Sequence, residues 1–264
     1  ARTGDHCGHL RRNKKLPRPC SKKELGAPCA VQSPSDDGGE GKAAQCHRRE
    51  DGCPAAVGRG KAGDRQLRAR GGAVVDRRAA AKIAAGKTVL DCFTHTGAFA
   101  LNAAAACAKH VTAVDISADA IQKTRRNAEL NGLSGRMDFV CADVFDLLTD
   151  MESNRKHGYD YIILDPPAFT KSRDTIGSAV KGYKAINAKA MKLLPRGGYL
   201  ATCSCSHFMT YELFTKTINQ AAHNVHKRLR QVEFRTQAPD HPILWAADES
   251  YYLKFYIFQV VEEM

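Results

Sequence analysis

The stretch KTVLDCFTHTGAFAL, residues 87–101, decides the fold of this chain of 264 residues. Its apolar first half predicts a buried strand over Lys87–Phe93, and the Ala-rich continuation predicts a helix over Gly97–Ala108. The loop between them contains a single glycine, Gly97. A buried strand that turns through a short loop into a helix is typical of a parallel sheet covered by helices.

The same alternation of strands and helices continues through the rest of the chain. Further strands are expected at His110–Asp115, Met137–Cys141, Tyr159–Leu164, Gly198–Cys203, Val232–Arg235 and Tyr252–Val260, and helices at 117–130, Asp143–Leu148, Ala179–Leu194 and Met209–Arg228. The last two strands have no helix between them, which favours an antiparallel hairpin. The expected fold is α/β, a Rossmann-like, doubly wound, mostly parallel seven-stranded sheet with an antiparallel C-terminal edge hairpin.

The first 77 residues differ in composition from everything that follows. They contain no Phe, Tyr, Trp, Ile or Met, so they cannot bury enough apolar surface to offset an ordering cost of about 1–2 kcal/mol per backbone residue. We therefore expect two parts: 1–77, a basic Gly- and Pro-containing tail that is either disordered or an artefactual extension, and 78–264, the folded domain.

Charge and cysteine content describe mainly that N-terminal segment. Most of the formal net charge of +12 lies there, so the basic balance says little about the folded domain. Half of the ten cysteines lie there too, without the spacing of zinc ligands, so no metal is expected. The chain has no apolar run of about 18 residues and no secretory signal, so we expect a cytoplasmic protein with reduced thiols and no membrane contact.

Four aspartates follow four successive predicted strands: Asp91, Asp115, Asp143 and Asp165. Ligands of doubly wound sheets bind outside the carboxyl ends of the strands. The loop after the first strand lacks G-x-G-x-x-G, which disfavours a dinucleotide and suits a smaller nucleoside ligand. Each aspartate alone is equally explained as a helix cap or turn residue, but the ordered set predicts S-adenosylmethionine. Asp115 would bind the ribose hydroxyls and Asp143 the adenine amino group.

The motifs in their order resemble a known family. LDCFTHTGAFAL, AVDIS, NAELNGL, ADVFDLL, ILDPPAFTKS, GYKAIN, LLPRGG and SCSH are similar to those of class I S-adenosylmethionine-dependent methyltransferases. With DHP at 240–242 and ESYYLK at 249–254, the chain resembles more narrowly the bacterial large-subunit ribosomal RNA cytosine-5 methyltransferases. The resemblance covers about residues 78–260. The D-x-F-x-x-x-G loop is widespread, whereas DPPAFTKS with SCSH is restrictive.

The resemblance implies two sets of binding residues. The cofactor set is Asp91, Phe93, Thr96, Gly97, Asp115, Ile116, Asp143, Val144 and Asp165. The substrate set, which would contact large-subunit ribosomal RNA, is Pro166, Pro167, Phe169, Lys171 and His207, with Arg173 and Lys181 as further phosphate contacts. A solvated charged surface explains the basic residues equally well, and a surface turn explains His207.

The chemistry implied by the resemblance needs a cysteine nucleophile. Carbon 5 of cytosine becomes nucleophilic only after a thiolate adds at carbon 6. Cys205 matches the family's nucleophile position, and Asp165 would bond the cytosine edge. Cys203 is a second, weaker candidate, because a period of two would turn it to the same face. The alternative is that Cys205 is a small buried turn residue; Cys92, Cys107 and Cys141 are expected in the core.

Two other functions stay open at this point. Enzymes that methylate exocyclic amines of adenine or guanine place an aromatic residue directly after the two prolines, where this chain has Ala168 and then Phe169. A non-catalytic RNA-binding module with a methyltransferase fold is the other. Members of the resembled family carry an RNA-binding PUA module before the catalytic domain, and 1–77 show no strand pattern for one. We therefore expect this chain alone to bind cofactor better than it methylates ribosomal RNA; its oligomeric state is open.

Overall fold

A computed structural model describes residues 73–170, 172–237, 241–247 and 250–263. The helices are α2 Ala73–Ala84, α3 Ala98–Ala105, α4 Ala118–Leu130, α5 Val144–Ser153, α6 Ile176–Leu193 and α7 Tyr211–Asn224, with short 3-10 turns η1 Ser134–Arg136 and η2 Arg173–Thr175. The strands are β1 Thr88–Cys92, β2 His110–Asp115, β3 Met137–Cys141, β4 Tyr161–Leu164, β5 Tyr199–Ser204, β6 Lys227–Arg235 and β7 Lys254–Glu263. The proposed tail lies almost wholly outside these ranges, so the division at residue 77 stays a prediction.

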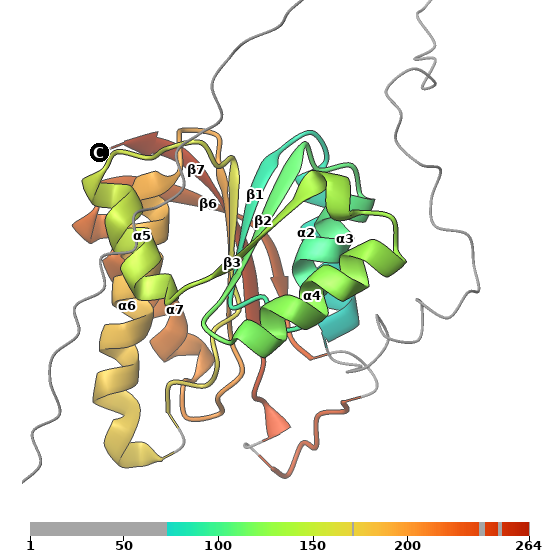
Figure 1. The fold of residues 1–264 in the computed structure, drawn as a ribbon. Coiled ribbons are helices and arrows are strands. Elements are labelled where there is room, and N and C mark those ends of the chain that lie inside the picture. The colour runs from blue at the N-terminus through green and yellow to red at the C-terminus, as the bar shows by residue number, and fades with distance from the viewer. Residues whose placement is uncertain (1–72, 171, 238–240, 248–249, 264) are drawn as a thin grey trace, which may run out of the picture. The chain divides into compact units, whose positions relative to one another are not determined.

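The seven strands form one sheet in the order β3-β2-β1-β4-β5-β7-β6 (Figure 1). Strands β1 to β5 pair in parallel, and β7 pairs antiparallel with both β5 and β6. The expected doubly wound sheet with an antiparallel C-terminal hairpin is therefore confirmed.

Several expected elements were wrong in extent, and the most consequential error lies between α7 and β6. The helix expected over Met209–Arg228 ends at Asn224, and Lys227 already belongs to β6. His226 has a φ of 55°. A residue whose backbone is in this left-handed region cannot continue a right-handed helix, so α7 ends before it. Most of β6 is only partly buried at the sheet edge, so its sequence KRLRQVEFR lacks the apolar run that marks the inner strands.

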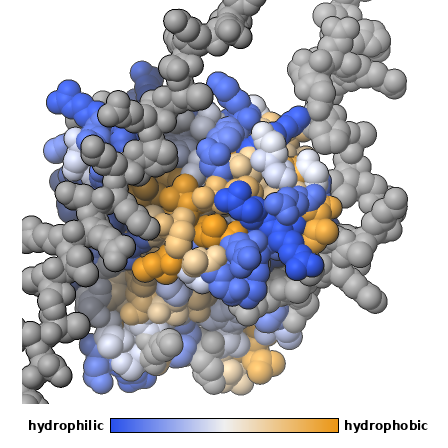
Figure 2. All heavy atoms as spheres, viewed as in Figure 1, coloured by the Kyte–Doolittle hydropathy of each residue, from blue (hydrophilic) through white to orange (hydrophobic). Residues whose placement is uncertain are grey.

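Two apolar layers pack against the two faces of the sheet. Helices α5, α6 and α7 cover one face, and α2, α3 and α4 cover the other (Figure 1). Side chains alternate between the two faces along β1, so this strand contributes to both layers. Leu90 and Cys92 pack in the layer with α5, α6 and α7, and Val89 packs in the layer with α2, α3 and α4. Figure 2 shows hydrophilic side chains gathered over α4 and apolar ones over the neighbouring edge strand β3. In the described ranges no helix is long and apolar enough to cross a membrane.

The strand order reverses direction at β1. The chain runs from β1 outward through β2 to β3 and then returns to β4 on the other side of β1. A crevice opens outside the carboxyl ends of the strands at such a switch point. The loops after β1, β2, β4 and β5 all reach this edge, which positions the candidate site.

Gly97 makes the turn from the β1 loop into α3. Its φ is 85°, and a Cβ atom there would lie 2.6 Å from Cγ2 of Thr124 on α4. The loop can therefore pack this closely on α4 only because residue 97 has no side chain.

Alanine substitutions at Gly97 and Gly132 can separate the cost of backbone strain from the cost of a steric clash. Gly132 also has a positive φ, 67°, but a Cβ atom there would meet nothing within 4 Å. We expect Gly132→Ala to lower the free energy of unfolding by about 1 kcal/mol through strain alone. Gly97→Ala should cost a further ~1–3 kcal/mol from overpacking. Urea denaturation measures both, and equal losses would contradict the clash.

Candidate active site

The loop after β1 holds an unusual backbone conformation. Phe93 and His95 have φ values of 64° and 53°, in the left-handed region that non-glycine residues rarely adopt. Such strain costs about 1–3 kcal/mol per residue and concentrates at functional sites. The backbone N–H of His95 donates to Oδ2 of Asp115 at 2.9 Å, and that of Thr94 donates to the Val114 carbonyl. The loop is thus fixed to the carboxyl end of β2.

Two side chains of α4 hold the same loop from the other side. Oγ1 of Thr124 donates to the His95 carbonyl at 2.9 Å, and Nδ2 of Asn127 donates to the Thr96 carbonyl at 3.0 Å. Neither residue had a predicted role, although Asn127 lies in the NAELNGL motif that carried the resemblance. Both act as positioning residues for the loop.

Asp91 lies at the centre of this arrangement and is fully buried. Its Oδ2 accepts from Oγ1 of Thr94 at 2.6 Å and from the backbone N–H of Ala100 at 2.9 Å. Its Oδ1 has no hydrogen-bond partner among the described residues. Burial raises the pKa of Asp91 to about 7; the hydrogen bonds from Thr94 and Ala100 oppose this rise, and the charge of Asp165 adds to it. Asp91 thus stabilises the loop after β1 through hydrogen bonds from Thr94, within the loop, and Ala100, in α3.

The ends of β2 and β3 offer groups that suit an adenosine moiety. Ile116 is 67% exposed, although it follows directly on a buried strand. Beside it, the half-buried Asp115 also accepts from the Ser117 backbone N–H through Oδ1. Asp143 caps α5 through Oδ1, which accepts from the Phe145 N–H at 2.7 Å. An apolar face between two carboxylates fits an adenine ring with ribose hydroxyls and an amino group as donors.

The remaining residues expected to bind the cofactor differ in accessibility. Phe93 and Thr96 are half-buried in the loop after β1. Val144 is only 2% exposed and packs in the core with the other buried residues of α5. Its place in the cofactor set stays a prediction.

The ends of β4 and β5 bring a carboxyl group and a thiol together. Sγ of Cys203 donates to Oδ1 of Asp165 at 3.1 Å and to the Leu164 carbonyl at 3.2 Å. Cys203 is buried, and burial raises the pKa of Asp165 while the Cys203 hydrogen bond opposes the rise. Pro166 is buried and Pro167 exposed, so the two prolines lead the chain out of the sheet.

Cys205 lies one residue beyond the end of β5 and is exposed. Partial burial of its thiol raises the pKa, and the negative charge of Asp165 adds to this effect. The backbone N–H groups of Cys205 and Ala168 and the charge of Lys254 act in the opposite direction, since they stabilise a thiolate. The thiol therefore lies beside the loop that follows Asp165.

Lys254 is a buried cation that had no predicted role. It is 4% exposed, and its Nζ donates to the carbonyls of Ser206 and Tyr252, at 2.8 Å in the second case. Burial lowers its pKa to about 8, and the neighbouring Cys205 opposes that shift. Its position in the ESYYLK motif was the only signal that marked it.

The expected substrate residues are spread over the same edge. His207 is exposed with its ring centroid 3.8 Å from that of Phe208, and Arg173 and Lys181 are exposed. Phe169 is half-buried, with its ring 4.6 Å from that of Tyr183. Lys171 lies outside the described residues.

The cysteines expected in the core divide into three cases. Cys92 is buried, which confirms the expectation. Cys107, two residues beyond α3, is half-buried and disulfide-bonded, so the expectation of a reduced thiol was wrong there. Cys141 is exposed, so its assignment to the core was wrong. The reason is that β3 is an edge strand, and its last residue has no neighbouring layer to cover it.

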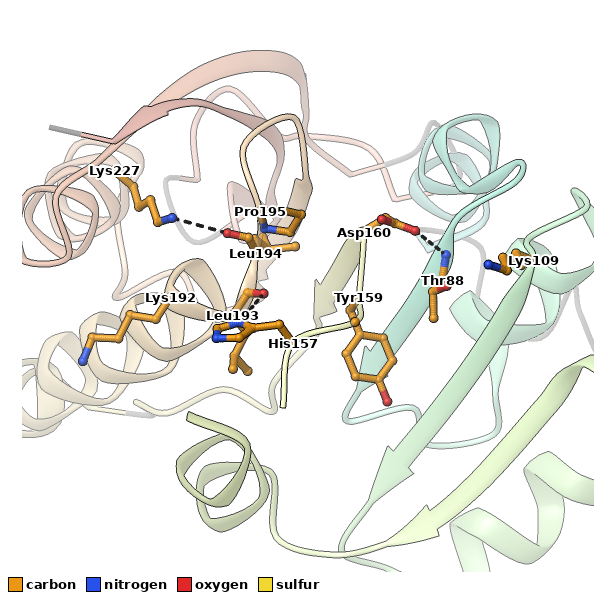
Figure 3. A pocket seen from close by; sticks show the side chains of 11 residues that line it. Thr88, Lys109, His157, Tyr159, Asp160, Lys192, Leu193, Leu194, Pro195 and Lys227 are labelled. Atoms are coloured by element: carbon orange, nitrogen blue, oxygen red, sulfur yellow. Dashed lines mark hydrogen bonds between the residues drawn. The ribbon is translucent and has the colours of Figure 1, made fainter. Parts of the chain in front are cut away.

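A separate hollow lies at the opposite edge of the sheet, where β1 and β4 begin (Figure 3). Its volume is about 580 Å³, and several of its polar groups are engaged with the protein. Lys227 donates to the Leu194 carbonyl, Asp160 accepts from the Thr88 N–H, and Lys192 pairs with Glu152. Figure 3 shows these side chains directed to separate points along the cavity wall rather than to one centre.

The sheet order is that of the class I methyltransferase fold, and the strained loop after β1 and the acidic groups after β2 and β3 lie at the edge where its cofactor crevice is expected. The chain belongs to the S-adenosylmethionine-dependent methyltransferase family, whose model matches residues 57–256. The expected cofactor, S-adenosylmethionine, is thereby confirmed.

Curated relatives and solved structures agree with this assignment. The chain is 43% identical over 186 residues to ribosomal RNA large subunit methyltransferase I of Shewanella denitrificans, covering 70% of this chain and 47% of the relative. The protein of that name from Aeromonas hydrophila is 44% identical over 180 residues, covering 68% and 45%. The crystal structure of SMU.776 complexed with SAH has a TM-score of 0.64 at 26% identity, covering 71% of this chain and 49% of that chain. This chain thus spans about half the length of the curated relatives.

The pKa of Asp91 predicts how stability depends on pH. In the folded protein the carboxyl stays protonated up to about pH 7, whereas in the unfolded chain it ionises near its ordinary value of 3.8. The unfolded state therefore binds fewer protons in this window, and this contribution to stability is lost as pH rises to 7. Asp91→Asn removes the titration, so the variant should gain up to about 4 kcal/mol relative to the parent across the window. The measurement is urea denaturation of both proteins at several pH values. A difference in unfolding free energy between variant and parent that does not change with pH would contradict the prediction.

The charges around Cys205 predict opposite effects on its reactivity. Asp165→Asn removes a charge that raises the thiol pKa, so alkylation of Cys205 by iodoacetamide near pH 7 should accelerate. Lys254→Met removes a charge that lowers it, so alkylation should slow; each change is at most about tenfold, the effect of one pKa unit. Mass spectrometry of the peptide measures both, with exposed Cys141 as the internal control. Changes in the same direction would indicate unfolding rather than charge.

Proposed function

We propose that this chain carries the catalytic domain of an RNA methyltransferase that forms 5-methylcytosine in large-subunit ribosomal RNA. The observation that supports this most is the exposed thiol of Cys205, directly after β5 and beside the Asp165-Pro166-Pro167 loop. The names of the curated relatives support the ribosomal RNA substrate.

The proposed reaction uses Cys205 as a covalent catalyst. Its thiolate adds to carbon 6 of cytosine, which forms a C–S bond and moves the electron pair of the carbon 5–carbon 6 double bond to carbon 5. When bound, S-adenosylmethionine would supply the methyl group to carbon 5, with cleavage of its sulfur–methyl bond and release of S-adenosylhomocysteine. A base then removes the proton from carbon 5, the double bond re-forms, and the thiolate leaves. The full cycle regenerates the enzyme, since the cysteine is released unchanged.

Asp165 is proposed to act on the opposite edge of the base. Burial raises its pKa, so the carboxylate takes up a proton more readily and can share it with the cytosine ring nitrogen as negative charge develops there. The thiol of Cys203 donates to Oδ1 of Asp165 and so fixes the orientation of the carboxyl group. In this proposal the buried Cys203 is a positioning residue, and Cys205 is the nucleophile.

Lys254 is proposed to position the nucleophile rather than to react. Its ammonium group ties the Ser206 carbonyl to the start of β7, and its charge favours the thiolate of Cys205. Because Asp165 and burial disfavour that thiolate, the lysine partly offsets both effects.

Methylation of an exocyclic amine fits the geometry less well. Enzymes of that kind need an aromatic ring after the two prolines, free to stack on the base. Here Ala168 holds that position, and the ring of Phe169 packs toward Tyr183 and Phe145 in the layer of α5 and α6.

Cysteine variants test the proposal. Cys205→Ala should lower methyl transfer to deproteinised large-subunit ribosomal RNA by about three orders of magnitude or more, because the covalent path is lost. Cys203→Ala should retain the covalent path and lose only part of the rate. Transfer of a labelled methyl group measures the rate, and mass spectrometry of nucleosides identifies the product.

Three outcomes would overturn parts of this proposal. A parental rate for Cys205→Ala would exclude covalent chemistry at this residue. A methylated adenine or guanine product would favour exocyclic-amine chemistry. A calorimetric titration without S-adenosylmethionine binding would favour a non-catalytic RNA-binding module.

A further inference from the structure

A cavity of about 1000 Å³ lies at the same edge of the sheet as Cys205. Its wall includes His207, two residues after Cys205, and Lys254, whose charge acts on the Cys205 thiol. Residues at the end of β6 and at the start of α7 complete it, because β6 runs parallel to β5 and ends at the same edge. If the target base binds at Cys205, the nucleotides next to it in the RNA would lie at the mouth of this cavity.

Aromatic side chains supply much of the cavity wall. Tyr211 and Tyr251 are 47% and 45% exposed, and Phe208 and Phe234 also line the cavity. The ring of Tyr211 is held by Phe234, with centroids 5.3 Å apart in an edge-to-face arrangement. Large aromatic rings that remain half exposed inside a cavity are unusual in a core and typical of a binding surface.

The wall contains more basic than acidic residues. The exposed Arg173 and His207 form its basic rim, Lys254 is buried with its ammonium group bonded to two carbonyls, and Glu212 is the acidic member of the lining. Aromatic faces combined with basic groups match single-stranded nucleic acid, because bases stack on the rings while phosphates contact the cations. An apolar small molecule would leave the basic rim unused.

From this geometry we infer that the cavity binds the single-stranded RNA nucleotides that flank the target cytosine, with Tyr251 and Tyr211 as stacking surfaces. This inference rests on the proposed function, and it assigns to the catalytic domain itself a contact to RNA outside the reacting base. The contact requires an unpaired segment, because paired bases do not expose their faces to a side chain.

Variants of Tyr251 test the stacking directly. Tyr251→Leu keeps apolar bulk but removes the ring face, so the affinity for a short fluorescein-labelled oligocytidylate should fall about tenfold in fluorescence anisotropy. Tyr251→Phe keeps the ring and should bind like the parent. Tyr199→Leu is the control for a lost tyrosine elsewhere, since Tyr199 lies at the opposite edge of the sheet over Lys87.

Salt dependence separates stacking from attraction by the many basic residues of the chain. Electrostatic binding weakens steeply as salt rises, whereas a stacking contribution does not. The ratio of parental to Tyr251→Leu affinity should therefore persist at high salt. Tyr211→Leu should show the same loss, with thermal denaturation as a check because Tyr211 also packs on Phe234.

The outcomes distinguish this inference from the proposed function. Equal oligocytidylate affinity of Tyr251→Leu and the parent, or no binding by the parent at all, overturns the inference even if the chain methylates ribosomal RNA. A tenfold loss confined to the Tyr251→Leu and Tyr211→Leu variants supports it even if no 5-methylcytosine forms.

Discussion

A carboxyl group without solvent contact organises the functional edge of this protein. Asp91 is the next-to-last residue of β1, and the two hydrogen bonds that it accepts from Thr94 and Ala100 fold the loop back over that strand. The loop can then present its backbone to Asp115, and Gly97 can pack against α4. The two bonds to Asp91 add to those with Asp115, Thr124 and Asn127 that offset the strained conformations of Phe93 and His95.

The sheet was predictable from sequence because its inner strands are short apolar runs between turns. His110–Asp115 and Met137–Cys141 were predicted to the residue. The predictions failed at residues whose burial depends on their place in the sheet rather than on the pattern of the sequence. Lys227–Arg235 reads as polar because one edge of the sheet leaves it uncovered, and Cys141 is exposed for the same reason at the other edge.

The order of aspartates along the chain could be predicted, but the bonds that position them could not. Thr124 and Asn127 meet carbonyl groups about thirty residues earlier in the chain, a separation with no periodic signature. The two cysteines show the same limit. Alternation predicted one face for Cys203 and Cys205, but β5 ends at Ser204, so one thiol is buried and the other exposed.

The insertion of β7 between β5 and β6 also has a consequence for biosynthesis. Lys254 begins the last described strand, yet it fastens the turn that carries Cys205, nearly fifty residues earlier. A ribosome releases the chain from its N-terminus, so the preceding strands leave the exit tunnel before this lysine does. The turn that carries Cys205 is therefore fastened to β7 only when synthesis of the sheet is nearly complete.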